Sequence, residues 1–423
     1  MTEAAAEKPS LKEAIFNRRM LICVFTGFSS GLPLFLLFQM VPAWLRMEGV
    51  GLAEIGFFTL IQFPYVWKFV WAPAVDRYVL PFLGRRRGWM LVTQIALLIT
   101  IAAMGLFNPT ISLGVVAGLA ATVAFFSATQ DIVLDAYRRE LLADSELGLG
   151  NAIHVQTYRF AGLVPGGLGL ILSDFLPWSS VFVIIAAFML VGIVMTLVID
   201  EAISEPDTPK TLKEAVINPF REFIGRNGLS SAVFVLAFIF FYKLGDNMAV
   251  ALQTPFFVDL GFSGTEIGTI AKLTGLTATL VGVMLGGIIM VKLGINRALW
   301  CFGLVQMLTI LAFAGLAEVG NDRLMLAGAM AFEYLGVGLG TAALTAFIAR
   351  STDPAFAATQ LSLFTALAAV PRVASNAVTG VIVEQMGWTN FFVLCMFLAV
   401  PGMLLLFKVA PWNETDDAEV QAA

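Results

Sequence analysis

Ionisable side chains inside long apolar stretches are the first feature of this sequence that could do chemistry. A charge that faces lipid is costly, so such residues are expected to face water, a cargo or one another. Carboxyls in this setting can carry a proton, and guanidinium or ammonium groups can bind an anion. The residues concerned are Lys68, Asp131, Asp135, Arg159, Lys243, Asp246, Lys272, Glu333 and Arg372.

The carboxyl groups are candidates for proton coupling. Asp131 and Asp135 are four residues apart and therefore share one face of a helix. Asp135 precedes Arg138 closely, which favours a structural ion pair near the inner surface. Asp131 lies one turn deeper, where two alternatives stay open: it carries a proton, or it pairs with Lys68 or another helix. The predicted proton-coupling residues are Asp131, Asp135, Asp246 and Glu333.

Lys243 and Asp246 are three residues apart, a spacing at which side chains on one helix can pair. The surrounding K-L-G-D-N segment offers an alternative, in which the helix unwinds at a binding site. Glu333 and Lys272 are each expected either to take part in coupling or to pair with another residue.

Arg159 and Arg372 occupy matching positions in an internal repeat described below. Two guanidinium groups facing one cavity would form a clamp for a carboxylate, since each can bind it with two hydrogen bonds. The alternative is that each arginine only neutralises an acid such as Asp131 or Glu333.

Aromatic residues accompany these charges. Tyr65 and Trp67 lie close to Lys68 and could stack on sugar rings, although packing or a place in the interfacial belt is the more ordinary role. The predicted substrate-binding residues are Arg159, Arg372, Lys68, Lys243, Lys272, Tyr65, Trp67, Gln130, Tyr158 and Tyr242.

The composition requires a membrane around most of the chain. Hydrophobic residues make up 59% and charged residues 13% of 423 positions, against about half and a quarter in soluble domains. The single histidine excludes a multi-histidine metal site, and the three cysteines lie in apolar runs. We therefore expect no metal, no cofactor, no disulfide and no nucleic-acid partner, and a transporter rather than an enzyme.

Twelve stretches are long and apolar enough to cross a bilayer, which takes about 20 residues each. The first begins after Arg18 and Arg19 and lacks a cleavage site, so it is expected to be a retained helix. The twelve spans are predicted at 20–46, 53–77, 88–107, 111–138, 147–173, 178–199, 228–259, 264–291, 297–317, 323–349, 356–384 and 388–409.

The distribution of lysine and arginine fixes a predicted orientation. With the N-terminus inside, 18 basic residues fall on the cytoplasmic side and only Arg46 and Arg323 on the outer side. This asymmetry follows the positive-inside rule. Both termini are therefore predicted to be cytoplasmic, and the chain is predicted to lie in a bacterial inner membrane as a functional monomer.

An internal repeat divides the chain. The segment Gly49–Gly56, G-V-G-L-A-E-I-G, recurs as G-F-S-G-T-E-I-G at Gly261–Gly268, an offset of 212 residues. This six-plus-six layout resembles the major facilitator fold, an all-α membrane fold of two pseudo-symmetric six-helix halves. The predicted parts are an N-tail at 1–19, a first half at 20–199, a connector at 200–226, a second half at 227–410 and a C-tail at 411–423.

The loop between the second and third spans, A-P-A-V-D-R-Y-V-L-P-F-L-G-R-R-R-G-W, resembles the signature loop of major facilitator transporters. It departs from that pattern at Ala72, where glycine is usual, and by an insertion before Gly84. The resemblance implies ion pairs that latch the inner side. The predicted gating residues are Asp76, Arg77, Arg85, Arg86 and Arg138.

Longer segments resemble one family within that superfamily. G-F-S-S-G-L-P-L, Y-V-W-K-F-V-W-A-P-A-V-D-R-Y and S-A-T-Q-D-I-V-L-D-A-Y-R-R-E-L are similar to the AmpG-type muropeptide permeases, and the similarity covers nearly the whole chain. It implies proton-driven import of N-acetylglucosaminyl-1,6-anhydro-N-acetylmuramyl saccharides and peptides for peptidoglycan recycling, with a link to β-lactam resistance. Such anionic cargo and protons would be the partners of the chain.

Other functions remain open at this point. The same fold supports proton-driven export of drugs or metabolites, and relatives can carry another anionic cargo such as acetyl-CoA. A membrane enzyme acting on lipid-linked sugars would need clustered acids in its loops, and the loops here are short.

Overall fold

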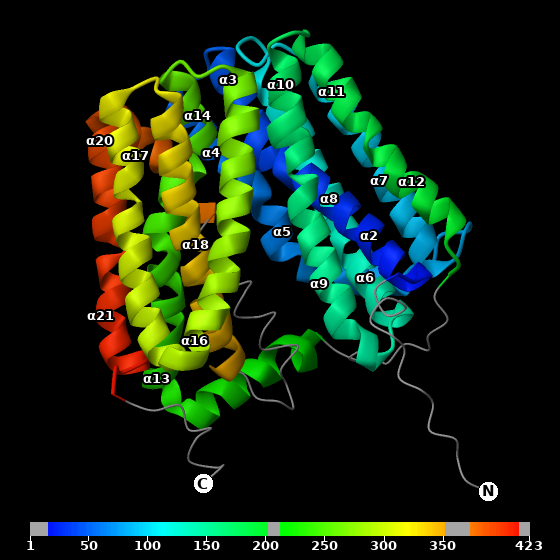
Figure 1. Cartoon of the computed structure of the whole chain (residues 1–423). Helices are drawn as coiled ribbons and strands as arrows, with labels where there is room; N and C mark the ends of the chain where they lie inside the picture. The colour runs from blue at the N-terminus through cyan, green and yellow to red at the C-terminus, as the bar shows by residue number, and fades with distance from the viewer. Residues whose placement is uncertain (1–15, 202–211, 352–372, 414–423) are drawn as a thin grey trace, which may run out of the picture. The chain divides into compact units, whose positions relative to one another are not determined.

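A computed structural model describes residues 16–201, 212–351 and 373–413, and these residues form helices and turns with no strand among them. Side-chain positions are not described throughout the segment 212–227. The helices follow the predicted spans in order, and each span is numbered here by its place in the chain (Figure 1).

The first half contains spans 1 to 6, several of them interrupted. Proline at position 33 precedes a π-helical turn in span 1, as expected where an amide donor is missing from a helix. The elements are α2 (Arg18–Phe35), η1 (Leu36–Met40), α3 (Val41–Met47), α4 (Leu52–Phe58), η2 (Thr59–Gln62), α5 (Phe63–Trp67), η3 (Lys68–Val70), α6 (Ala72–Arg77), α7 (Arg85–Met104), α8 (Leu113–Leu141), α9 (Asp144–Ala161), η4 (Val164–Gly169), α10 (Leu170–Ser173), α11 (Trp178–Ala187) and α12 (Met189–Val198).

The second half contains spans 7 to 12, with span 11 described only from residue 373 onward. The elements are α13 (Leu212–Ala251), α14 (Gln253–Asp259), α15 (Gly264–Glu266), η5 (Ile267–Ala271), α16 (Lys272–Thr309), α17 (Leu311–Val319), α18 (Arg323–Ser351), α20 (Thr379–Leu398) and α21 (Val400–Val409). Helix α16 contains most of span 8 and most of span 9.

Single glycines make the sharp turns inside three of these long helices. Gly228, Gly294 and Gly387 have φ of 74°, 74° and 76°, a left-handed conformation that favours a residue without Cβ. Gly294 separates span 8 from span 9, and Gly387 separates span 11 from span 12. The predicted boundaries at 291–297 and 384–388 are therefore confirmed.

Within the described residues, eight helical runs are long and apolar enough to cross a membrane by length and composition. Two of them, Gly264–Val319 and Thr379–Val409, include the turns at Gly294 and Gly387 and so hold parts of two spans each. Spans 2 and 5 do not reach that threshold as continuous helices.

The chain divides into two compact units. Unit 1 comprises Met1–Met40, Trp67–Gly169 and Leu176–Glu205, and unit 2 comprises Val41–Val66, Leu170–Phe175 and Pro206–Ala423. Unit 2 thus includes the ends of spans 1, 2 and 5, so the units differ from the predicted halves. The predicted limits of the halves stay a prediction.

Each unit has its own apolar core. In unit 1, Met90, Leu134 and Tyr137 are buried together between α7 and α8. In unit 2, Phe238 packs against the rings of Tyr242 and Phe347. Helices α16 and α18 run alongside one another in this unit (Figure 1). Large apolar side chains such as Val291, 87% exposed, point outward, as expected for a surface solvated by lipid.

Candidate functional site

Asp131 lies on α8 in unit 1 and faces span 1. The Ser30 hydroxyl of α2 donates to Asp131 Oδ1 at 2.6 Å. The neighbouring Gln130 amide is fully buried, and its Nε2 donates to the Ser29 carbonyl at 2.8 Å. Gln130, predicted to bind substrate, therefore lies between α2 and α8, where it contacts backbone.

Asp135 lies one turn from Asp131 and is half-exposed. Arg138 Nη2 donates to Asp135 Oδ1 at 2.9 Å, so the predicted structural ion pair is confirmed. Lys68 Nζ lies 4.0 Å from the other oxygen of Asp135. Arg138 also donates to Asn151 at 2.8 Å, which ties α8 to α9. The Asp131 carboxylate therefore accepts a hydrogen bond from a hydroxyl, whereas the cationic side chains of Arg138 and Lys68 lie beside Asp135.

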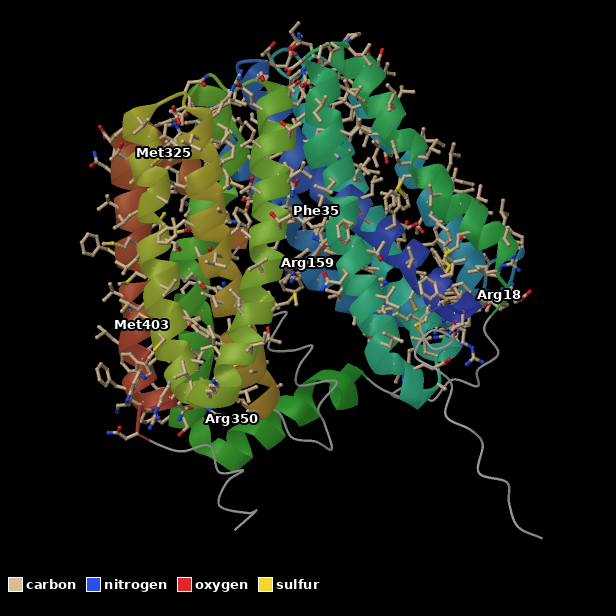
Figure 2. The ribbon with its side chains drawn as sticks, viewed as in Figure 1. Arg18, Phe35, Arg159, Met325, Arg350 and Met403 are labelled. Atoms are coloured by element: carbon tan, nitrogen blue, oxygen red, sulfur yellow. The ribbon has the colours of Figure 1, made fainter. Side chains whose placement is uncertain are left out.

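Arg159 lies on α9 near Phe35 of α2, as the labelled side chains in Figure 2 show. The Phe35 ring contacts the Tyr158 ring with centroids 5.3 Å apart. No acid among the described residues forms an ion pair with Arg159, and its side chain is only partly buried. Arg372 falls outside the described residues, so the predicted two-arginine clamp stays a prediction.

Other polar and aromatic residues of the first half have ordinary surroundings. His154 is buried with its Nδ1 3.2 Å from the Thr26 hydroxyl, a satisfied polar position. Trp67 is 52% exposed. Trp71, which was not predicted as a site residue, donates through Nε1 to Thr129 at 3.0 Å.

A buried polar cluster occupies the middle of unit 2. Lys243 Nζ lies 3.3 Å from Asp246 Oδ2 and donates to Gln306 Oε1 at 2.8 Å and to the Val337 carbonyl at 3.4 Å. Helix α13 departs from helical φ/ψ only at Gly228, so the helix is not unwound around Lys243. Of the two predicted alternatives for this segment, the structure shows the pairing of Lys243 with Asp246.

Glu333 completes this cluster from α18. It is fully buried, and neither carboxyl oxygen has a hydrogen-bond partner of good geometry among the described residues. Asp246 is close enough to interact with it electrostatically, and Lys243 is the cation that offsets both. We name Lys243, Asp246 and Glu333 the acid–base cluster. It contains two carboxyls and one ammonium.

Further polar residues lie in unit 2. Lys272 Nζ donates to the Thr254 hydroxyl at 3.3 Å, and Tyr334 donates to Gln253 at 2.7 Å. The hydroxyl of Tyr242, predicted to bind substrate, donates to the Leu299 carbonyl at 3.0 Å in the interior. Gln306 was missed by sequence reasoning because it is neutral.

The loop before α7 carries part of the predicted inner latch. The buried Arg86 guanidinium pairs with Glu140 at 2.7 Å. The Glu201 carboxylate accepts hydrogen bonds from the Arg86 and Arg87 amides at 2.6 and 3.1 Å, which caps the start of α7. The Asp76 side chain lies outside the described residues, so its role in a latch stays a prediction.

Glu140 and Glu201 were both missed as site residues. Glu140 follows Arg138 and Arg139 directly in the sequence, and Glu201 begins the connector. Arg77 is exposed, and Arg85 and Arg139 make further contacts.

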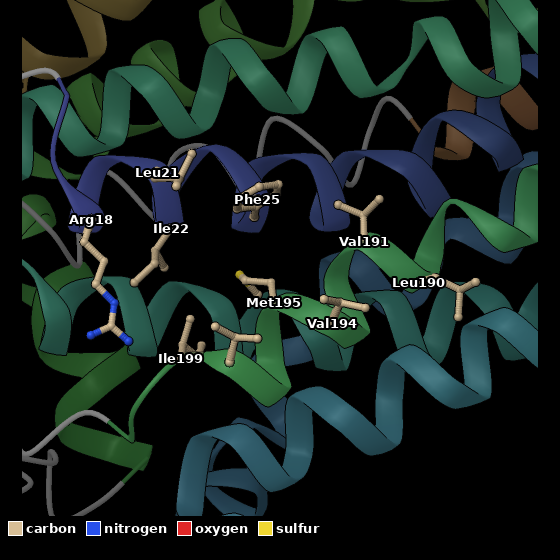
Figure 3. A pocket seen from close by; sticks show the side chains of 10 residues that line it. Arg18, Leu21, Ile22, Phe25, Leu190, Val191, Val194, Met195 and Ile199 are labelled. Atoms are coloured by element: carbon tan, nitrogen blue, oxygen red, sulfur yellow. The ribbon is translucent and has the colours of Figure 1, made fainter.

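An apolar groove of about 520 Å³ lies between α2 and α12 in unit 1 (Figure 3). Its lining includes Phe25, Val194 and Met195, and Arg18 is at one end. Apolar walls suit a lipid chain better than a saccharide, so this groove is not the predicted cargo path.

Comparison with known proteins now adds to this geometry. The model of the Major Facilitator Superfamily matches residues 23–373. A protein of Haemophilus influenzae described as uncharacterized is 50% identical over 417 residues, covering 96% of this chain and 98% of its own. The anhydromuropeptide permease of Escherichia coli K12 is 43% identical over 390 residues, covering 92% of this chain and 79% of that protein.

The chain belongs to the AmpG-type permeases of the major facilitator superfamily. Solved structures agree on the fold: a D-xylose-proton symporter matches with a TM-score of 0.74 at 12% identity, covering 93% of this chain and 98% of that one. The nucleoside transporter NupG matches with a TM-score of 0.69 at 12% identity, over 95% of this chain and all of that one. The predicted fold and family of this permease are therefore confirmed, and it is a multi-pass membrane protein.

Proposed function

We propose that this permease imports anhydromuropeptides, the saccharides and peptides released from peptidoglycan, into the cytoplasm. The observation that carries the proposal is its 43% identity, over 92% of the chain, with the E. coli anhydromuropeptide permease. Muramyl lactate and peptide carboxylates are anions and need cations on their route. Arg159, which has no acidic partner among the described residues, supplies one such cation, and the partly exposed Lys68 supplies another.

Proton coupling is the second part of the proposal, and the acid–base cluster supports it. Two buried carboxyls facing one ammonium leave a net negative charge unless one carboxyl holds a proton. A buried uncompensated charge is strongly unfavourable, so the cluster is expected to hold a proton whenever it is closed off from water. Release of that proton then requires access to water on the cytoplasmic side. Asp131 is proposed as a second proton carrier, in the first half.

The transport cycle follows from this charge balance. A proton taken up from the outer side neutralises the cluster and allows the helices of unit 2 to close around it. Release of the proton inside restores the negative charge and favours the hydrated arrangement. Because protons flow inward down their gradient, this coupling drives cargo inward. The permease is proposed to work as a monomer in the bacterial inner membrane with both termini in the cytoplasm.

Uptake into proteoliposomes tests this proposal. The purified permease is reconstituted, and radiolabelled anhydromuropeptide uptake is measured with and without an inward proton gradient. We expect accumulation above the external concentration only with the gradient. The Glu333→Gln variant should equilibrate cargo without accumulating it. Accumulation that survives collapse of the gradient would show that transport is not coupled to protons. Efflux of cargo would indicate an exporter. No movement of the anhydromuropeptide in either direction would mean that the permease carries another cargo.

A further inference from the structure

Three sets of polar contacts in unit 2 join segments of the first half to segments of the second half. They involve the ends of spans 1, 2 and 5, which unit 2 includes, and the starts or ends of spans 7, 8 and 11. By the basic-residue asymmetry these ends lie on the outer side of the membrane. The predicted latch at Arg86 belongs to the opposite side, so the outer contacts form a separate group.

The first contact is an ion pair between residues at matching positions of the repeat. Arg46 Nε lies 2.5 Å from Asp259 Oδ1, and the two side chains are only 27% and 18% exposed. The positions differ by 213, the same offset that relates Pro42 to Pro255. Repeat-related residues of two halves can touch only where the pseudo-twofold axis passes between them. Trp388 Nε1 also donates to Asp259 at 3.0 Å.

The second contact caps the start of span 8 with a carboxylate from span 5. Asp174 accepts hydrogen bonds from the Gly264 amide at 2.9 Å and the Thr265 amide at 2.7 Å. The first amides of a helix have no partner within the helix and favour a negative charge. Asp174 therefore holds the end of span 5 against the start of span 8.

The third contact repeats this arrangement with the halves exchanged. Glu384, near the end of span 11, accepts a hydrogen bond from the Ala53 amide at the start of span 2 at 3.0 Å. Ala53 and Thr265 are related by the repeat offset of 212. Each half thus caps the other half's second helix, and the two caps are related by the pseudo-symmetry.

Glycines bring these backbones too close for any side chain. A Cβ on Gly56 would lie 2.9 Å from the Ala377 carbonyl, and one on Gly380 would meet the Leu52 carbonyl. A Cβ on Gly264 would meet the Leu170 carbonyl of α10. The helices are therefore in direct backbone contact at both caps, and nothing the size of a saccharide passes between them.

We propose that Asp174, Glu384 and the Arg46–Asp259 pair are the outer gate of the permease. Cargo that enters from the outer side has to separate span 2 from span 11 and span 5 from span 8, which breaks both caps in every cycle. Each cap is a single carboxylate on backbone amides that water can replace, so the gate opens and recloses without loss of helix structure. This assignment rests on the proposed direction of transport.

Accessibility of a buried cysteine tests the gate without using cargo. Thr59 on η2 is buried, and its hydroxyl lies 3.5 Å from the Val373 carbonyl of span 11, so opening of the gate exposes it. Cys23, Cys301 and Cys395 are replaced by serine, Thr59→Cys is introduced, and a membrane-impermeant maleimide is added to the outer side of oriented vesicles.

Loss of a cap is expected to raise the labelling rate. Asp174→Ala and Glu384→Ala, which remove the accepting oxygens, should each increase it by about five- to thirtyfold, the shift in open population that loss of one helix cap produces. Gly56→Leu should wedge the gate open, giving the fastest labelling and no accumulation of cargo. Gly287→Leu on α16 is the matched control, since a Cβ there meets nothing within 4 Å, and it should label like the parent.

Two results would overturn the assignment. Unchanged labelling in both Asp174→Ala and Glu384→Ala, with the parent labelled slowly, means that the caps do not hold the outer side shut. Labelling of the parent as fast as that of Gly56→Leu means that no gate covers Thr59. If Gly56→Leu does not reach the membrane, the labelling rates of the two cap variants still test the assignment. Because no cargo is present, failure here is separate from failure of the proposed cargo.

Discussion

Lys243 Nζ lies 2.8 Å from Gln306 Oε1, a hydrogen bond from span 7 to span 9. Span 9 contributes no charge to the membrane interior, yet its neutral amide supplies the best acceptor of the buried ammonium. The side chain of Gln306 fits because Gly340 on α18 has no Cβ: one placed there would meet Gln306 Oε1 and lie 3.6 Å from Lys243 Nζ. Helices α13, α16 and α18 therefore together determine the position of the Lys243 ammonium group.

Substitution of Gly340 by alanine should disturb this arrangement. The added methyl would displace the Gln306 amide from Lys243, and overpacking of this kind costs about 1–3 kcal/mol. Gly328→Ala on the same helix is the control, because a Cβ there meets nothing within 4 Å, and it should be neutral or stabilising by about 1 kcal/mol. Denaturant unfolding in detergent measures both, and equal stability of the two variants would contradict the packing argument.

Removal of Lys243 should be far more harmful than removal of the ion pair. Lys243→Met leaves Asp246 and Glu333 with no cation, and loss of one partner of a buried pair costs about 3–5 kcal/mol. The double variant Lys243→Met/Asp246→Leu removes the excess charge as well and should recover most of that loss. A double variant no more stable than the single one would show that the cluster is not balanced as its contacts indicate.

Asp131 is expected to matter for accumulation and not for binding. Asp131→Asn keeps an acceptor for the Ser30 hydroxyl but cannot release a proton, so accumulation should fail while counterflow exchange of labelled cargo continues. Asp200→Asn, whose side chain is 82% exposed, is the control and should retain accumulation. Normal accumulation by Asp131→Asn would assign coupling to the acid–base cluster alone.

Arg159 should determine the apparent affinity for anionic cargo. Loss of a charge-assisted hydrogen bond weakens binding by about ten- to a hundredfold, so Arg159→Ala should raise the half-saturating cargo concentration by that factor. Arg159→Lys should recover part of it. The measurement is concentration-dependent uptake, and an unchanged half-saturating concentration would place cargo away from α9. Arg297, exposed and beside the Trp412 ring, offers a matched control arginine.

Arg86 should stabilise the first half through Glu140. Their side chains are 6% and 17% exposed, so Arg86→Leu leaves a nearly buried carboxylate unpaired and should cost about 3–5 kcal/mol. Arg86→Leu/Glu140→Leu should lie within about 1 kcal/mol of the parent. Thermal unfolding in detergent separates the two, and a mild single variant would mean that water reaches Glu140.

The helices can be predicted from the sequence because length and hydrophobicity decide membrane spans. The polar and glycine-bearing breaks between apolar stretches place the turns at Gly294 and Gly387 correctly. The pairing of Asp135 with Arg138 and of Lys243 with Asp246 can also be predicted, since both depend on spacing within one helix.

Contacts between distant helices are the part that sequence reasoning misses. Gln306 binds Lys243, which is 63 residues away in the sequence, and Glu140 pairs with Arg86, which is 54 residues away. No local sequence pattern identifies either residue. The repeat is visible at Gly49 and Gly261, but nothing in it indicates that Arg46 pairs with Asp259. Whether repeat-related residues touch depends on where the symmetry axis runs, which only the packed structure shows.

The glycine turns at Gly294 and Gly387 have a practical consequence for anyone who labels this permease. They leave almost no chain between consecutive spans, so an inserted epitope or fluorescent protein would have to break a helix to fit. The connection between α6 and α7, residues 78–84, is non-helical and largely exposed. Reporter insertions and accessible protease sites are therefore better sought in the first half.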